Sequence, residues 1–179
     1  MNMLPRLPKK ISNMIHSRLA REKAHNILRM FGVTEPPVDI DRIAKLLDFK
    51  IVSFDFPDSV SAVIRIEGSS KVIGVNKKHA LVRQKFSIAH ELGHYLSGHE
   101  NFSHEKTMFV DPEKKYLDPQ YIQEQEADEF AAELLMPEDF LKNDVTVEKL
   151  KIADLAKKYN VSEQAMTIQL INLQLPVQG

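Results

Sequence analysis

The stretch Ser87-Ile88-Ala89-His90-Glu91-Leu92-Gly93-His94-Tyr95-Leu96 contains two histidines four residues apart, with a glutamate directly after the first. On a helix of 3.6 residues per turn, residues four apart lie one above the other, so the His90 and His94 imidazoles can reach one metal ion. Glu91 lies about 100° around the helix from His90, where it can face a water molecule beside that ion. The stretch therefore predicts a helical metal site.

The spacing His-Glu-x-x-His is typical of zinc peptidases. Two neutral imidazoles and one further protein ligand leave a fourth position on Zn²⁺ for water, whose pKa falls toward about 7. Glu91 is then the predicted general base that takes a proton from this water. The alternative is an amphipathic helix whose polar face carries these residues by chance. The apolar residues around the motif follow 3- and 4-residue steps and predict a packed helix, where unpaired histidines and carboxylates are costly.

The composition limits the class of protein. The chain has 179 residues, 43% of them hydrophobic, which suits one globular domain of ordinary size. A net charge of −1 excludes a global attraction to nucleic acid or membranes. The chain has no cysteine, so histidine, glutamate and aspartate must supply the ligands of any zinc ion. No apolar run is long enough to span a bilayer or to form a signal-peptide core, and we expect a cytoplasmic protein.

Residues 1–31 form a basic N-terminal segment with seven basic residues and one acidic residue. Their apolar residues recur at helical spacing, which predicts a helical segment. Two interpretations stay open, a helix that docks on the rest of the protein and an arm that binds an acidic partner.

Residues 32–140 carry the pattern of an α+β, mainly helical core. Gly32 ends one helix, and Asp39 or Asp41 can cap the next. Strand-like runs follow at 50–54, 62–66 and 71–76, and a Gly-Ser-Ser turn joins the last two. We expect a small antiparallel sheet that leads into the histidine helix near Leu81.

A second helical pattern covers residues 124–137 and ends at Pro137. Glu124 and Asp128 share a face with small alanines that allow close packing against the histidine helix. We therefore predict Glu124 as the third metal ligand and Asp128 as the acceptor of a ligand histidine's N–H. Glu126 is the alternative ligand.

The connection from residue 98 to about residue 120 holds His99 and His104. They are possible extra ligands, but we interpret them as exposed loop histidines. The candidates for the group that stabilises the oxyanion are Tyr95, His99, His104, Tyr116 and Tyr121.

Residues 141–179 form the third segment and resemble a helix-turn-helix over 146–175, with Ser162 as the N-cap of the last helix. That helix carries no lysine or arginine for phosphates or guanines. This argues against DNA binding and favours a segment that packs on the core or docks a protein.

These motifs together resemble the ImmA/IrrE family of metallo-endopeptidases. The matching stretches are residues 37–44, 73–76, 83–94, 124–137 and 161–166. The resemblance implies a zincin-like fold, one zinc ion bound by His90, His94 and Glu124, and Glu91 as the base. Gln169 and Gln174 stand where members of the family often have arginine and glycine.

Characterised members of this family, which occurs in phages, integrative elements and bacteria, cleave a helix-turn-helix repressor. The resemblance thus predicts a zinc endopeptidase that acts on a cognate repressor. The alternative from another class is a non-catalytic regulator that binds protein or DNA and uses the metal structurally.

Overall fold

The computed structural model describes residues 9–99 and 118–176 of the chain. Within these ranges it contains seven helices and three strands. In chain order they are α1 (Lys9–Met30), α2 (Ile40–Leu46), β1 (Phe49–Phe54), β2 (Ala62–Glu67), β3 (Ser70–Asn76), α3 (Leu81–Ser97), α4 (Pro119–Leu135), α5 (Glu138–Thr146), α6 (Ile152–Tyr159) and α7 (Glu163–Asn172). The predicted α+β fold is confirmed. None of the described helices combines the length and the apolar character that crossing a membrane requires.

The sheet is mixed, with strand order β1-β3-β2. The hairpin β2–β3 is antiparallel, as predicted, and Gly68 adopts a φ of +58° in its turn. β1 pairs with β3 in parallel, so the prediction of an antiparallel sheet was wrong for this strand. Alternating hydrophobicity marks a strand but carries no information on the direction of its partner, which depends on the tertiary packing.

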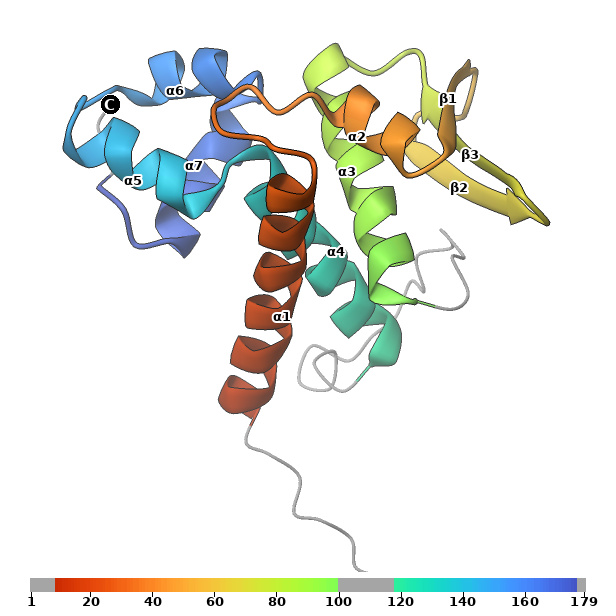
Figure 1. The fold of residues 1–179 in the computed structure, drawn as a ribbon, viewed down its shortest axis with the longest axis horizontal. Coiled ribbons are helices and arrows are strands. Elements are labelled where there is room, and N and C mark those ends of the chain that lie inside the picture. Colours follow the sequence, from red (N-terminus) through yellow and green to blue (C-terminus); the bar gives the residue numbers. More distant parts are fainter. Residues whose placement is uncertain (1–8, 100–117, 177–179) are drawn as a thin grey trace, which may run out of the picture.

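The helices α3 and α4 pack closely at the centre of the molecule, with the sheet beside α3 and the helices α5–α7 on the other side (Figure 1). A Cβ atom at Gly93 would lie 3.1 Å from Ala127 Cα and 3.0 Å from the Phe130 ring. The two backbones can approach this closely only because Gly93 has no side chain. The predicted contact between the histidine helix and the alanine-containing helix is thus present.

The helix α1 lies along α4 and buries the apolar side chains Ala20, Ala24, Ile27 and Leu28. Three pairs between side chains of α1 and carboxylates of α4 flank this contact. The pairs occur in the same order along both helices, so the two helices run parallel (Figure 1). We call them the α1–α4 ladder: His16–Glu126, Arg21–Glu129 and His25–Glu133. The helix therefore docks on the body of the protein, and part of its basic character is matched within the chain.

A buried aspartate joins the C-terminal helices. Asp144 accepts hydrogen bonds from the Tyr159 hydroxyl at 2.8 Å and from Lys158 Nζ at 2.7 Å.

The Ser162 hydroxyl accepts a hydrogen bond from Ala165 N, which confirms the predicted N-cap of α7. Gln169 is buried and donates to Glu133, while Gln174 has a φ of +56°. Positive φ favours glycine, the residue that the resembled family often has at this position.

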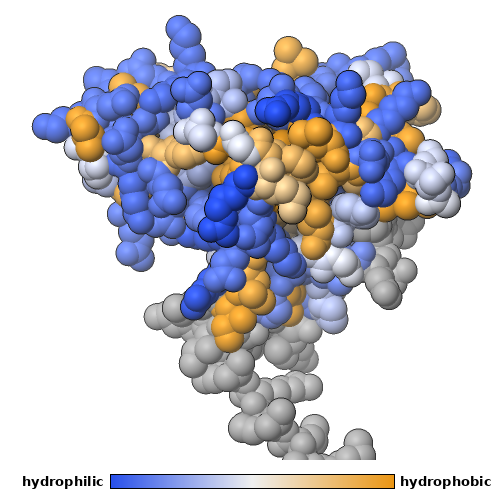
Figure 2. Space-filling view, viewed as in Figure 1, coloured by the Kyte–Doolittle hydropathy of each residue, from blue (hydrophilic) through white to orange (hydrophobic). Residues whose placement is uncertain are grey.

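The molecular surface is uneven in hydropathy. On the face shown in Figure 2, hydrophilic residues cover most of the surface around α5, while hydrophobic residues gather around α2. Met30 and Leu46 are among the exposed large hydrophobic residues.

Candidate metal centre

The helix α3 places the predicted motif at its contact with α4. Ile88, Ala89 and Leu92 are buried in the core and fix the rotation of the helix. With that rotation, His90 is partly buried and His94 is buried on the side of α3 that faces Glu124. The helix ends at Ser97, and the φ of +66° at the following Gly98 turns the chain back toward the last turn.

Three ligand side chains from two helices converge on one point. His90 Nε2 lies 3.0 Å from His94 Nε2, and Glu124 Oε2 and Oε1 lie 3.5 and 3.4 Å from these two nitrogens, respectively. In a tetrahedral zinc site with bonds of 2.0–2.1 Å, neighbouring ligand atoms are about 3.3 Å apart. The spacing of the three groups therefore fits a zinc ion, and the two-histidine, one-carboxylate set suits its chemistry.

Asp128 holds the His90 ring from behind. His90 Nδ1 lies 2.9 Å from Oδ1 of Asp128, the residue predicted to accept the N–H of a ligand histidine. Burial of the His90 ring disfavours its charged form, but the contacts with Asp128 and Glu124 outweigh this effect and raise the pKa of His90 to about 10. Hydrogen bonds with His90 and His94 hold the pKa of the Glu124 carboxyl well below its usual range. The centre thus attracts positive charge.

His99 corrects the sequence analysis, because it is not an exposed loop histidine. Only 8% of its surface is exposed, and its Nδ1 lies 2.9 Å from His94 Nδ1. The turn at Gly98 brings the His99 ring under His94, with His99 N donating to the His94 carbonyl oxygen. The signal in the sequence was a glycine next to a histidine one turn after the motif.

Glu126, the alternative ligand, faces away from the three converging groups. Its Oε2 atom lies 2.7 Å from His99 Nε2, and its other oxygen contacts His16 of α1. Burial acts to raise the pKa of Glu126, but the hydrogen bonds with His99 and His16 outweigh this effect and hold the pKa below its ordinary value. The structure therefore places Glu126 behind His94, with His99 between the two side chains.

The contacts from Glu126 through His99 to His94 determine which ring nitrogen of each histidine carries a proton. The Glu126 carboxylate can only accept, so His99 Nε2 carries the proton and His99 Nδ1 accepts one from His94 Nδ1. Burial lowers the pKa of His99 and favours this neutral form despite the nearby Glu126. The lone pair of His94 Nε2 then points toward the proposed metal position. Asp128 contacts Nδ1 of His90, so His90 would bind a zinc ion through Nε2 once the Nε2 proton has been displaced.

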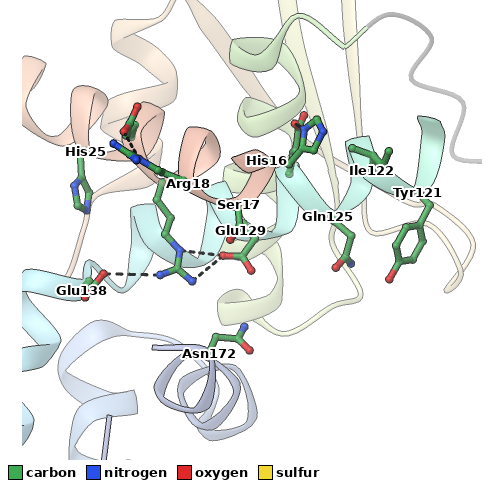
Figure 3. Close-up of a pocket in the computed structure, with 13 residues that line it drawn as sticks. His16, Ser17, Arg18, His25, Tyr121, Ile122, Gln125, Glu129, Glu138 and Asn172 are labelled. Atoms are coloured by element: carbon green, nitrogen blue, oxygen red, sulfur yellow. Dashed lines mark hydrogen bonds and ion pairs between the residues drawn. The ribbon is translucent and has the colours of Figure 1, made fainter. Parts of the chain in front are cut away.

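The remaining predicted residues have different places. Glu91, the predicted base, is 2% exposed on α3. The Tyr95 ring packs edge-on against Phe49, with ring centres 4.9 Å apart. Tyr121 lines a groove of about 720 Å³ between α1 and α4 (Figure 3), which also contains His16 of the α1–α4 ladder. His104 and Tyr116 lie outside the described residues.

Comparison with known proteins identifies the family of the chain. Residues 44–170 match the IrrE N-terminal-like domain, a peptidase family, and the chain belongs to this family. The family is metal-dependent, and it includes regulators. No curated protein matches the chain.

A solved structure shares the fold. It is a Mycobacterium tuberculosis transcriptional regulator with 17% sequence identity to this chain and a TM-score of 0.59. The match covers 89% of this chain and 48% of the regulator, so the chain spans about half the length of that protein. At this identity the likeness concerns the fold alone.

Proposed function

We propose that the chain is a zinc-dependent endopeptidase. The observation that carries this proposal is the convergence of His90, His94 and Glu124 within 4.8 Å of one another. Among the described residues this is the one group of three or more such side chains that could hold a metal ion. Glu91, which follows His90 directly in the sequence, is the general base that the motif predicts. A structural zinc site has four protein ligands, whereas a catalytic site has three and an open position.

A zinc ion held by these three residues would act as a Lewis acid that makes water nucleophilic at neutral pH. Glu91 accepts a proton as the water oxygen adds to the peptide carbonyl carbon. The C–N bond then breaks, and Glu91 returns the proton to the nitrogen of the leaving amine. Asp128 and His99 hold the two ligand histidines in the required tautomers.

We further propose that the substrate is a helix-turn-helix repressor of a phage or mobile element, as in the family that the chain resembles. A protein partner is favoured over DNA because α7 carries neither lysine nor arginine. The alternative, a non-catalytic regulator with a structural metal, requires that Glu91 be dispensable.

A pair of substitutions tests the catalytic proposal. Glu91→Gln should keep one zinc ion per chain and lower cleavage by about 10²–10⁴-fold, because the general base is lost. Glu124→Ala should lose both zinc and cleavage, and Glu67→Gln, on the exposed part of β2, should retain both. Zinc is measured by mass spectrometry, and cleavage is measured with candidate helix-turn-helix repressors and with a synthetic peptide library.

Two results would contradict different parts of this proposal. Full cleavage by Glu91→Gln would exclude Glu91 as the base. Cleavage of the peptide library but of no repressor would keep the peptidase and reject the substrate.

A further inference from the structure

A largely apolar groove of about 710 Å³ lies between α3, α4 and α7. We call it the α3–α4–α7 groove. Its apolar lining includes Val82, Phe86, Ala132, Met136, Ala165 and Ile168. The helix α7 of the C-terminal segment thus forms one wall of a depression whose other walls belong to the two helices of the metal centre.

The groove adjoins the candidate metal centre through Asp128. Asp128 lines the groove and at the same time contacts His90. Phe86 precedes His90 by four residues and Val82 by eight, so both lie on the same side of α3, one and two turns away. A polypeptide whose scissile bond lies at the metal centre can therefore extend directly into the groove.

The charged side chains of the groove already have partners. Asp128 contacts His90, Glu129 accepts from Arg21 at 3.1 Å, and Arg83 donates to the Ser61 hydroxyl at 3.0 Å. The other polar side chains along it are amides and a hydroxyl, which suit hydrogen bonding to a peptide backbone. The groove therefore favours an uncharged segment with apolar side chains.

We propose that the α3–α4–α7 groove binds the substrate segment next to the scissile bond and selects a large apolar side chain there. This inference rests on the proposed function and adds its specificity site. The volume lies in the range of about 300–1,000 Å³ that is usual for ligand sites. The helix α7 of the helix-turn-helix-like segment then forms one wall of the substrate site.

Two matched pairs of variants isolate the groove. Ile168 lines it and is 52% exposed, whereas Ile171 on the same helix is 60% exposed and does not line it. Val82 lines it and the neighbouring Leu81, 73% exposed, does not. Ile168→Arg and Val82→Arg place a charge in the groove, and Ile171→Arg and Leu81→Arg add the same charge beside it.

The first measurement is the cleavage of a synthetic peptide library by the zinc-loaded full chain, read by mass spectrometry. We expect a large apolar residue at one fixed position beside the cut. Ile168→Arg and Val82→Arg should lower kcat/KM for such peptides by about tenfold or more, while the two control variants stay near wild type. Equal effects of all four variants would overturn the groove proposal and leave the peptidase intact.

The second measurement separates the groove from catalysis. Zinc-loaded Glu91→Gln is immobilised, and the peptides of the same library that it retains are identified. If the wild type cleaves nothing but retention of apolar peptides is lost with Ile168→Arg and kept with Ile171→Arg, the peptidase proposal fails and the groove is a peptide site. If nothing is cleaved and no apolar peptide is retained, both proposals are overturned.

Discussion

A buried histidine behind a ligand histidine decides which nitrogen faces the metal. His99 fixes the tautomer of His94, and Glu126 fixes that of His99, so the ligand is oriented by groups that do not touch the metal position. Outer contacts of this kind commonly change metal affinity by about 10–100-fold when they are removed.

We predict that His99→Ala weakens zinc binding by about 10–100-fold while the fold is retained. His79→Ala is the matched control, because His79 lies outside the centre and contacts the Asp58 carbonyl oxygen. Zinc affinity is measured by competition with a chelating dye, and folding by circular dichroism. Equal affinities of the two variants would show that His99 does not orient His94.

The raised pKa of His90 predicts a pH dependence of metal binding. Because this pKa is about 10, His90 holds a proton throughout the neutral range in the absence of a metal, and zinc must displace it. Binding should release about one proton from this group, and the dissociation constant should rise about tenfold for each unit by which the pH falls below 8.

Calorimetry in two buffers with different ionisation enthalpies counts the released protons. Asp128→Asn removes a carboxylate that raises the pKa of His90 and should reduce this proton release near pH 8. A dissociation constant independent of pH between 6 and 8 would contradict the assignment.

At the scale of the elements, the centre depends on how closely α4 approaches α3. The carboxylate ligand comes from α4 and both histidines come from α3, so the helix separation sets the size of the site. Gly93 lies at this contact, with Ala127 and Phe130 opposite.

Gly93→Ala should therefore lower the free energy of unfolding by about 1–3 kcal/mol, because the added methyl group overpacks the contact. Zinc binding should weaken as well, because the shift carries Glu124 away from the histidines. Leu81→Ala, on the exposed start of α3, is the control. Chemical denaturation and zinc titration check the two effects, and unchanged values for Gly93→Ala would contradict the proposed tight contact.

The elements themselves were predictable because their signals are local. The bounds of the three strands, the caps at Asp39 and Ser162, and the start of α3 follow from alternation, turn residues and capping. Helical periodicity favoured Glu124 over Glu126 as the third ligand, and Glu124 lies beside both histidines in the structure. These features need only neighbours within a few residues.

Contacts between distant segments were not predictable in this way. The parallel pairing of β1 with β3 depends on how the chain returns to the sheet. The burial of His99 depends on α4 and α1 closing over the end of α3, which its loop position conceals. For the same reason, the sequence could not decide whether the basic N-terminal residues bind a partner or the body of the protein.

At the scale of the whole molecule, α1 is part of the core. Ile27 and Leu28 are buried by its packing, and full burial of two such side chains stabilises the fold by about 3–6 kcal/mol. A typical domain has a total free energy of unfolding of about 5–15 kcal/mol.

Deletion of residues 1–31 should therefore leave the chain largely unfolded or unable to bind zinc, because α4 loses its cover. Deletion of residues 1–8 keeps α1 complete and should leave stability near that of the full chain. Circular dichroism and zinc content distinguish the two. A folded, zinc-binding chain that lacks residues 1–31 would show that this segment is dispensable.

The α1–α4 ladder also constrains how the sequence can diverge. Its partners lie 110, 108 and 108 residues apart in the chain, yet each position is tied to the side chain opposite. A change of Arg21 to an acidic residue sets two like charges together unless Glu129 changes in the opposite sense. Positions 16, 21 and 25 are therefore expected to covary with positions 126, 129 and 133 among homologues, with Glu126 the least variable because it also serves His99.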